Sequence, residues 1–119
     1  MRALWILAVV ALIGGILHFR NGSGAAELHP DDPRHGTGND RIVMLAAAWC
    51  GYCRKQQAEF SRANVRYRIL DVDTEEGDRA MRAVGARTVP VTIIGQDLVR
   101  GYNVAALDEK LSPLGYRVY

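Results

Sequence analysis

The chain has 119 residues, of which 49% are hydrophobic and 24% charged. This length allows one domain with appendages, and the hydrophobic fraction excludes a low-complexity disordered chain. The 15 Lys and Arg residues nearly balance the 13 Asp and Glu residues, so we expect no nucleic-acid partner. Two cysteines are too few for a disulfide scaffold, and alone they cannot fill a four-ligand structural zinc site.

The amino-terminal segment is strongly apolar. Residues 3–19 follow one basic residue, Arg2, and only His18 interrupts their apolar character. A membrane-spanning helix needs about 17–25 residues, and the core of a signal peptide about 7–15. We therefore expect residues 1–20 to be a transmembrane anchor or a signal peptide, and we favour a single-pass anchor. The distribution of basic residues favours a domain on the extracytoplasmic (periplasmic) side; the alternative is secretion after signal cleavage.

Residues 21–40 differ sharply in composition from the apolar segment before them. They are rich in Gly and Pro and show no apolar periodicity, which predicts a flexible linker. His29 and His35 lie within it and are interpreted as solvated residues, so no metal site is predicted. The globular domain is expected to span residues 41–119.

The first half of this domain predicts a strand, a helix and a second strand. Residues 42–47 form a continuous apolar run, which suits a central strand buried on both faces, with Met44 in the core. Residues 54–63 contain strong helix formers and neither Gly nor Pro. Apolar and basic residues then alternate from Val65 to Ile69, the period of a strand. Because a helix joins the two strands, they should be parallel.

The second half predicts a helix, a hairpin and a last helix. Residues 73–76 resemble a capping box with Asp73 as the N-cap, and Gly85 should end the helix that begins there. That helix should bury three apolar residues: Ala80, Met81 and Val84. Residues 91–94 and 98–100 should pair as antiparallel strands across a tight turn. The last helix should turn one apolar face to the core: Val104, Leu107, Leu111 and Leu114.

The spacing of the two cysteines, Cys50 and Cys53, carries the chemistry. Cys50 stands where a strand ends and a helix begins, so unpaired backbone N–H groups and the helix dipole stabilise its thiolate. Cys53 is one turn further on, within reach to resolve a mixed disulfide. Arg54 and Lys55 add positive charge. A zinc site would need a second cysteine pair, and a static disulfide across two residues gains little stability. The spacing therefore favours a redox-active dithiol.

Three short motifs accompany the cysteine pair along the chain: Trp49-Cys50-Gly51-Tyr52-Cys53, Thr88-Val89-Pro90, and Gly101 before the last helix. In these motifs the sequence resembles the thioredoxin superfamily and, within it, the glutaredoxins, from residue 41 to about 111. The resemblance implies an α/β, thioredoxin-like (glutaredoxin) fold, β-α-β-α-β-β-α, with a four-stranded mixed sheet flanked by helices. It also implies a cis Pro90 packed against the disulfide, with Thr88 and Val89 offering backbone groups to substrate. The substrate- or glutathione-binding residues it implies are Trp49, Tyr52, Thr88, Val89, Pro90, Gly101, Tyr102 and Asn103.

Two departures from the glutaredoxin pattern concern glutathione. Ala47 stands where the family commonly has Lys, and Asn103 replaces the acidic residue of the Gly-Gly-x-Asp element. Both anchors for glutathione are therefore weakened, although Arg54, Lys55 or Arg87 could supply a cation. The Gly-Tyr-Asn sequence is closer to the glutaredoxin-like electron donors that thioredoxin reductase recycles.

We expect a thiol–disulfide oxidoreductase with Cys50 as nucleophile and Cys53 as resolving cysteine. The resemblance implies no tightly bound cofactor, glutathione as a potential co-substrate, and a disulfide-bearing protein or a glutathione mixed disulfide as partner. The reductant would be glutathione or a thioredoxin-reductase-like system. Gly51 replaces the common Pro, a change that accompanies iron–sulfur binding in some relatives. The alternative is therefore a non-catalytic, glutathione-dependent iron–sulfur module bridging two chains. A third reading is an anchored domain with an inert structural disulfide.

Overall fold

The computed structural model describes residues 5, 6, 8–10 and 27–119. Residues 5, 6 and 8–10 are helical, and most of the expected anchor, residues 3–19, lies outside the described residues. The first part of the expected linker lies outside them too. Over the part of the chain that is described, no helix has the length and apolar character needed to cross a membrane.

A four-stranded mixed sheet forms the centre of the domain, in the order β2-β1-β3-β4. The strands are β1 (Ile42–Ala46), β2 (Arg68–Asp71), β3 (Val91–Ile94) and β4 (Asp97–Arg100). β1 runs parallel to β2 and antiparallel to β3, and β3 runs antiparallel to β4. The predicted fold class and strand directions are confirmed.

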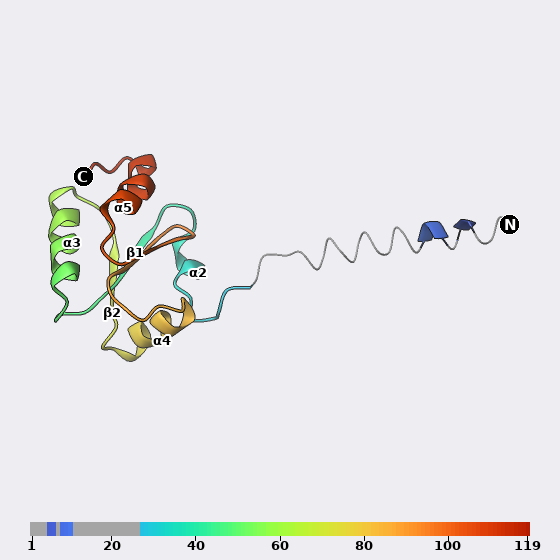
Figure 1. Cartoon of the computed structure of the whole chain (residues 1–119), viewed down its shortest axis with the longest axis horizontal. Helices are drawn as coiled ribbons and strands as arrows, with labels where there is room; N and C mark the ends of the chain where they lie inside the picture. The colour runs from blue at the N-terminus through green and yellow to red at the C-terminus, as the bar shows by residue number, and fades with distance from the viewer. Residues whose placement is uncertain (1–4, 7, 11–26) are drawn as a thin grey trace.

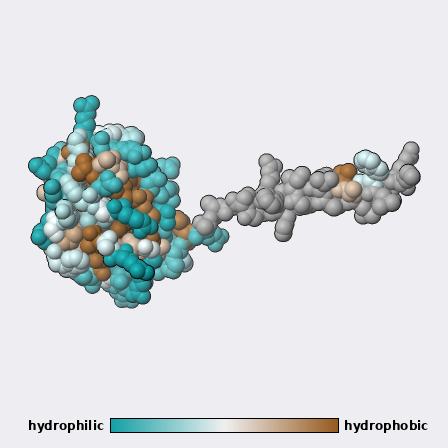
Figure 2. All heavy atoms as spheres, in the orientation of Figure 1, coloured by the Kyte–Doolittle hydropathy of each residue, from teal (hydrophilic) through white to brown (hydrophobic). Residues whose placement is uncertain are grey.

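Helices cover both faces of this sheet (Figure 1). α3 (Gly51–Arg62) and α5 (Val104–Leu111) pack on one face, and α4 (Glu75–Ala83) packs on the other. A short 3-10 turn, η1 (Ser112–Leu114), follows α5. The α3 and α5 face buries a cluster made by helix and strand residues together: Ile42, Phe60, Val65, Ile94, Val99, Leu107 and Leu111. In Figure 2 most residues at the rim of the domain are hydrophilic, and hydrophobic residues are visible among them on the face in view.

The central strand β1 is buried because helices cover both of its sides. Met44 packs in the cluster that contains the two cysteines, and Leu45 packs in the cluster beneath α4. Neither side chain is exposed. The apolar run was therefore interpreted correctly as a central strand, with Met44 in the core.

The edge strand β2 differs from its predicted pattern. It begins only at Arg68, and its buried residue is Leu70, whereas Ile69 is 46% exposed. Val65 and Tyr67 are apolar for another reason: both pack with the α3 and α5 cluster before the strand starts. The alternation was real but belonged to a loop that packs on the core.

The start of α4 also differs from the prediction. The N-cap is Thr74, whose hydroxyl accepts a hydrogen bond from the Gly77 N–H at 3.1 Å, so Asp73 is not the cap. A Cβ on Gly77 would stand 1.9 Å from the carbonyl oxygen of Asp71. The helix begins against the end of β2 at a distance that only glycine allows. The same closeness explains a glycine in the first turn.

The end of α4 agrees with the sequence. Gly85 adopts a φ of 67°. Its N–H donates to the Arg82 carbonyl and the Ala86 N–H donates to the Met81 carbonyl, as in a Schellman motif. The three predicted core residues are all buried: Ala80, Met81 and Val84.

The last helix turns a narrower face to the core than predicted. Leu107 and Leu111 are fully buried, and Leu114 packs against them from η1. Val104 is 38% exposed, so its inclusion was wrong. It is the first residue of α5, where the chain is still arriving from the β4–α5 loop.

Residues 32–40 are not a free tether, contrary to the expected linker. α2 (Arg34–Thr37) packs on the β3–β4 hairpin, where the fully buried Thr37 hydroxyl donates to the Gly95 carbonyl. The Gln96 side chain donates to the carbonyl oxygens of Arg34 at 3.0 Å and Gly38 at 2.8 Å. These contacts are polar, so apolar periodicity could not reveal them.

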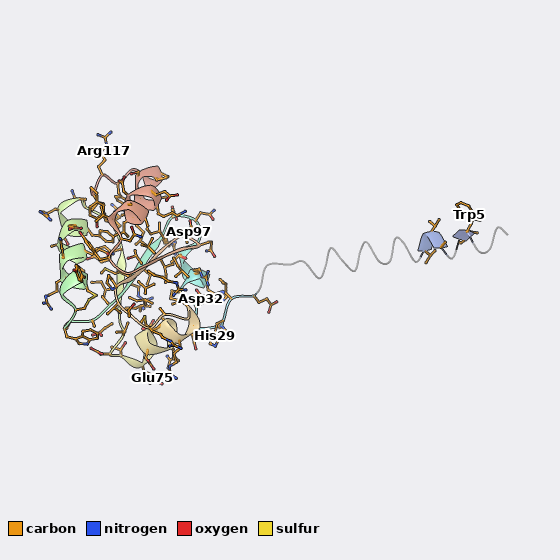
Figure 3. All side chains as sticks on the ribbon, in the orientation of Figure 1. Trp5, His29, Asp32, Glu75, Asp97 and Arg117 are labelled. Carbon is orange, nitrogen blue, oxygen red and sulfur yellow. A yellow bond between two sulfur atoms is a disulfide. The ribbon has the colours of Figure 1, made fainter. Side chains whose placement is uncertain are left out.

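Asp32 fixes the start of this docked segment (Figure 3). It is 3% exposed and pairs with the Arg34 guanidinium at 2.7 Å. Burial alone would raise the pKa of Asp32. Hydrogen bonds from the side chain and backbone N–H of Arg34 outweigh burial and hold that pKa below its usual value.

Candidate active site

The two cysteines form a disulfide across the first turn of α3, with Cα atoms 5.2 Å apart. Cys50 is the N-cap of the helix, and its sulfur accepts a hydrogen bond from the Cys53 N–H at 3.1 Å. α3 therefore begins at Gly51, three residues earlier than predicted from the helix formers. Cys53 is fully buried and Cys50 is 7% exposed. The predicted placement of Cys50 at a helix start is confirmed.

The Thr88-Val89-Pro90 segment lies beside the disulfide. The Val89–Pro90 peptide bond is cis, as the resemblance implied, and the Val89 carbonyl oxygen is 3.9 Å from the Cys50 sulfur. Val89 packs with the cysteine cluster, Pro90 is buried, and Thr88 is exposed. The Pro90 carbonyl accepts from the Gly101 N–H at 2.8 Å, which ties the segment to the end of β4.

Trp49 stands next to Cys50 and is 68% exposed, so it is a surface residue and not part of the core. Its indole N–H donates to the Asp73 carboxylate at 3.0 Å. Asp73 lies between β2 and α4, so β2 separates it from the two cysteines along the sequence. Asp73 was predicted to cap the helix, and its contact with Trp49 was not predicted because the local pattern contains no signal for it.

On the other side of the site, Tyr52 stacks on Tyr102. Their ring centroids are 5.6 Å apart, and Tyr52 is 63% exposed. The Tyr102 hydroxyl donates to Glu59 at 2.6 Å, and the Lys55 ammonium lies 5.2 Å from the centre of the Tyr102 ring. The hydrogen bond to Glu59 is the main cause that raises the pKa of Tyr102. The β4–α5 loop is thereby fastened to α3.

Two further residues of this region were not found from the sequence. Glu59 is one, since nothing local marks it as a partner of Tyr102. Tyr119, near the chain end, is the other: burial and the nearby Glu59 raise its pKa. Its proximity to Glu59 depends on tertiary packing, for which the tail sequence offers no pattern.

Asn103 has a structural task in this loop. Its side-chain oxygen accepts from the Ala106 N–H at 3.1 Å and caps α5. Gly101, two residues earlier, has a φ of 76°, which favours glycine at that position. The predicted binding residues Gly101, Tyr102 and Asn103 thus lie beside the cysteines' helix, but the Asn103 oxygen is already engaged.

The cations near the disulfide differ in their freedom. Arg54 donates to the Ala48 carbonyl at 2.6 Å, and Lys55 lies over Tyr102, while Arg87 is exposed. Arg54 also borders a pocket of about 350 Å³. The pocket lies between α3 and the exposed side of β2, and its other lining residues are Ala46, Ala47, Ala48, Gln57, Ile69 and Asp71. Among residues 27–119 no group of three His, Cys, Asp or Glu side chains gathers into a metal site.

The domain resembles known proteins in sequence and in fold. Residues 42–99 match the family model for glutaredoxin. No curated protein sequence matches the chain. Buckwheat glutaredoxin in complex with glutathione is 28% identical with a TM-score of 0.56, covering 68% of this chain and 81% of that one.

Two further solved structures share the fold. A glutaredoxin from Archaeoglobus fulgidus is 24% identical with a TM-score of 0.55, covering 75% of this chain and 98% of that one. The glutaredoxin-like NrdH-redoxin from Escherichia coli is 24% identical with a TM-score of 0.53, covering 58% of this chain and 92% of that one. The domain match and the Cys50–Cys53 pair together support a thiol–disulfide oxidoreductase. Residues 42–99 of this chain therefore resemble a glutaredoxin domain.

Proposed function

We propose that the protein exchanges disulfides by a dithiol mechanism, with Cys50 as the nucleophile and Cys53 as the resolving cysteine. One observation carries the assignment: the Cys50 sulfur caps α3 and accepts the Cys53 N–H at 3.1 Å. That N–H and the helix dipole stabilise a thiolate on Cys50 once the pair is reduced. Of the two sulfurs, Cys50 alone belongs to a residue with exposed surface, whereas Cys53 is fully buried.

The reaction has two exchange steps. The Cys50 thiolate attacks a partner disulfide, the partner's S–S bond breaks, and one partner sulfur leaves as a thiolate. Cys53 then loses its proton and attacks the Cys50 sulfur, and the second partner sulfur leaves. The partner has gained two electrons, and the Cys50–Cys53 disulfide has formed. A thiol reductant restores the dithiol by the reverse steps.

A disulfide-bearing protein suits the site better than glutathione as the principal substrate. Exposed Trp49 and Tyr52 stand on either side of Cys50, and the exposed residue Thr88 lies next to Val89. These features offer surface to a protein chain. The buckwheat relative binds glutathione, and here glutathione remains a weaker co-substrate because Ala47 has no charge and the Asn103 oxygen is engaged. The reductant proposed is a thioredoxin-reductase-like system.

Two cysteine variants test the mechanism. Cys50→Ser should abolish reduction of a model disulfide such as insulin, while Cys53→Ser should accumulate a mixed disulfide through Cys50 that mass spectrometry detects. The two substitutions remove the same bond, so each controls for loss of the disulfide itself. Full activity of Cys50→Ser would refute the assignment. The alternative, an iron–sulfur module bridging two chains, predicts a visible absorption band and dimers after anaerobic reconstitution with iron, sulfide and glutathione.

We also propose that residues 3–19 anchor the protein in a membrane, with the domain on the extracytoplasmic side. The apolar character of this segment and Arg2 before it support the proposal. In a bacterial host the full chain should stay with the membrane after an alkaline carbonate wash, and external protease should digest the domain. A soluble product lacking the segment would indicate signal cleavage and secretion instead.

A further inference from the structure

One buried polar side chain of α3 has only part of its hydrogen-bonding capacity used. Gln56 on α3 is fully buried, and its amide nitrogen donates to the Thr92 hydroxyl at 2.6 Å. Its amide oxygen is buried and has no hydrogen-bond partner among the residues that the structure describes. An unmade hydrogen bond of this kind is costly in a protein core, so an unpaired buried group calls for a reason.

The same face of the sheet holds Gln56 and the resolving cysteine. Thr92 pairs with Met44 across β3 and β1, and Met44 packs in one cluster with Cys53. Directly opposed residues of an antiparallel pair project to the same face, so Thr92 lies on the α3 side as well. Cys53 and Gln56 are three residues apart on α3, a spacing that places side chains next to each other. Both are fully buried, so both face the sheet.

The redox state of Cys53 decides what Gln56 can do. In the disulfide the Cys53 sulfur carries no hydrogen and cannot donate. Reduction breaks the Cys50–Cys53 bond, and two thiols of a reductant such as glutathione join in a new disulfide. Of the two protons they release, one ends on Cys53, and the other passes to solvent because Cys50 stays a thiolate. Cys53 then has an S–H donor inside the core, on the same buried face of α3 as the unpaired oxygen of Gln56.

We propose that Gln56 is the hydrogen-bond acceptor for the reduced Cys53 thiol and thereby sets the reduction potential of the pair. This inference rests on the proposed exchange function and deepens it. The acceptor is unpaired in the disulfide form and paired in the dithiol form. Gln56 therefore favours the reduced state and makes the pair more oxidising than an apolar residue at this position would.

The test is the equilibrium of the full chain, purified in a mild detergent, against glutathione buffers of defined ratio. Gln56→Met keeps the length of the side chain and removes the acceptor. The equilibrium should shift toward the disulfide by about fivefold, the lower end of the cost of leaving a buried donor without a partner, because S–H is a weak donor. At 29.6 mV per tenfold change, that is a potential about 20 mV more negative.

Gln57→Met is the matched control. It makes the same chemical change one residue along α3, at a position that borders the outer pocket instead of the core. Its potential should equal that of the wild type. Thr92→Val is a second control, because it removes the other partner of the same amide and leaves the acceptor of Gln56 in place. A merely structural role would shift stability in both redox states equally and leave the potential unchanged.

An unchanged potential in Gln56→Met, or a shift toward less negative values, would overturn the proposal. Equal shifts in Gln56→Met and Gln57→Met would overturn it too. The equilibrium needs only the cysteine pair and glutathione. It therefore gives a result even if the cysteine variants show that protein disulfides are not substrates, and the two proposals can fail separately.

Discussion

Gly77→Ala should destabilise the protein, although alanine is the better helix former. An alanine in place of glycine inside a helix usually adds about 1 kcal/mol of stability. At Gly77 the new Cβ would stand 1.9 Å from the Asp71 carbonyl oxygen, 2.4 Å from the Asp71 carbonyl carbon and 2.9 Å from the Val72 Cα. All three are backbone atoms, so no side chain can rotate out of the way. The whole start of α4 or the end of β2 must move.

The expected net effect is a loss of about 1–3 kcal/mol, the usual cost of overpacking in a rigid site. The assay is urea unfolding of the full chain in a mild detergent, followed by far-ultraviolet circular dichroism. The shift in midpoint multiplied by the slope gives the change in the free energy of unfolding.

Gly51→Ala is the matched control for this substitution. Gly51 also lies in the first turn of a helix, and its new Cβ would meet only the far end of Arg54, at 3.9 Å. This variant should be as stable as the wild type or slightly more stable. Equal stability of the two alanine variants would refute the argument that close approach of α4 to β2 requires a glycine at position 77.

Three further predictions concern polar contacts. Arg34 holds the pKa of Asp32 below its ordinary 3.8, so the stability that ionised Asp32 contributes is fully present above pH 3.8 and is lost as the pH falls through the lowered pKa. Asp32→Asn should remove this part of the acid dependence, measured as urea midpoints between pH 2 and 6. An unchanged acid profile in the variant would contradict the prediction. Asp73→Asn keeps a neutral acceptor for the Trp49 indole in place of a charged one, a loss of about 1 kcal/mol. It should raise KM for a protein disulfide about two- to tenfold with kcat little changed, and an equal fall in kcat would contradict it. Asn103→Asp keeps the cap of α5, since both residues cap well, and should raise activity with glutathione mixed disulfides by supplying a carboxylate. No gain in activity over the wild type would show that charge at this position is not what limits glutathione use.

Local patterns predicted the parts of the fold that local physics determines. The apolar run of β1, the end of α4 at Gly85 and the hairpin of β3 and β4 all follow from neighbouring residues, and each was correct. Cys50 at a helix start is of the same kind. The boundaries of α3 and α4 were less accurate because each helix is set by its N-cap: α3 begins before its run of strong helix formers, and Thr74 caps α4 in place of Asp73.

The remaining part of the site depends on contacts between distant residues. Trp49 reaches Asp73 across 24 positions, and Tyr102 reaches Glu59 across 43. Thr37 reaches Gly95 across 58 positions, which is why a docked segment was taken for a linker. Each of these three contacts is one polar hydrogen bond, whereas periodicity detects apolar residues that recur at a regular spacing. A sequence without relatives beside it contains no signal for them.

These distant contacts share a consequence for how the site works. The disulfide itself forms across the start of one helix, but both exposed aromatic residues beside it are held by other elements. Trp49 is held by Asp73, just before the N-cap of α4, and Tyr52 is held through Tyr102 of the β4–α5 loop. The chemistry and the surface that meets the partner are therefore separable. Substitutions in Asp73 or Glu59 should alter which disulfides are accepted without altering the potential of the pair. A substitution at Gln56 should do the reverse, because its side chain lies beneath the sulfurs and has no exposed surface.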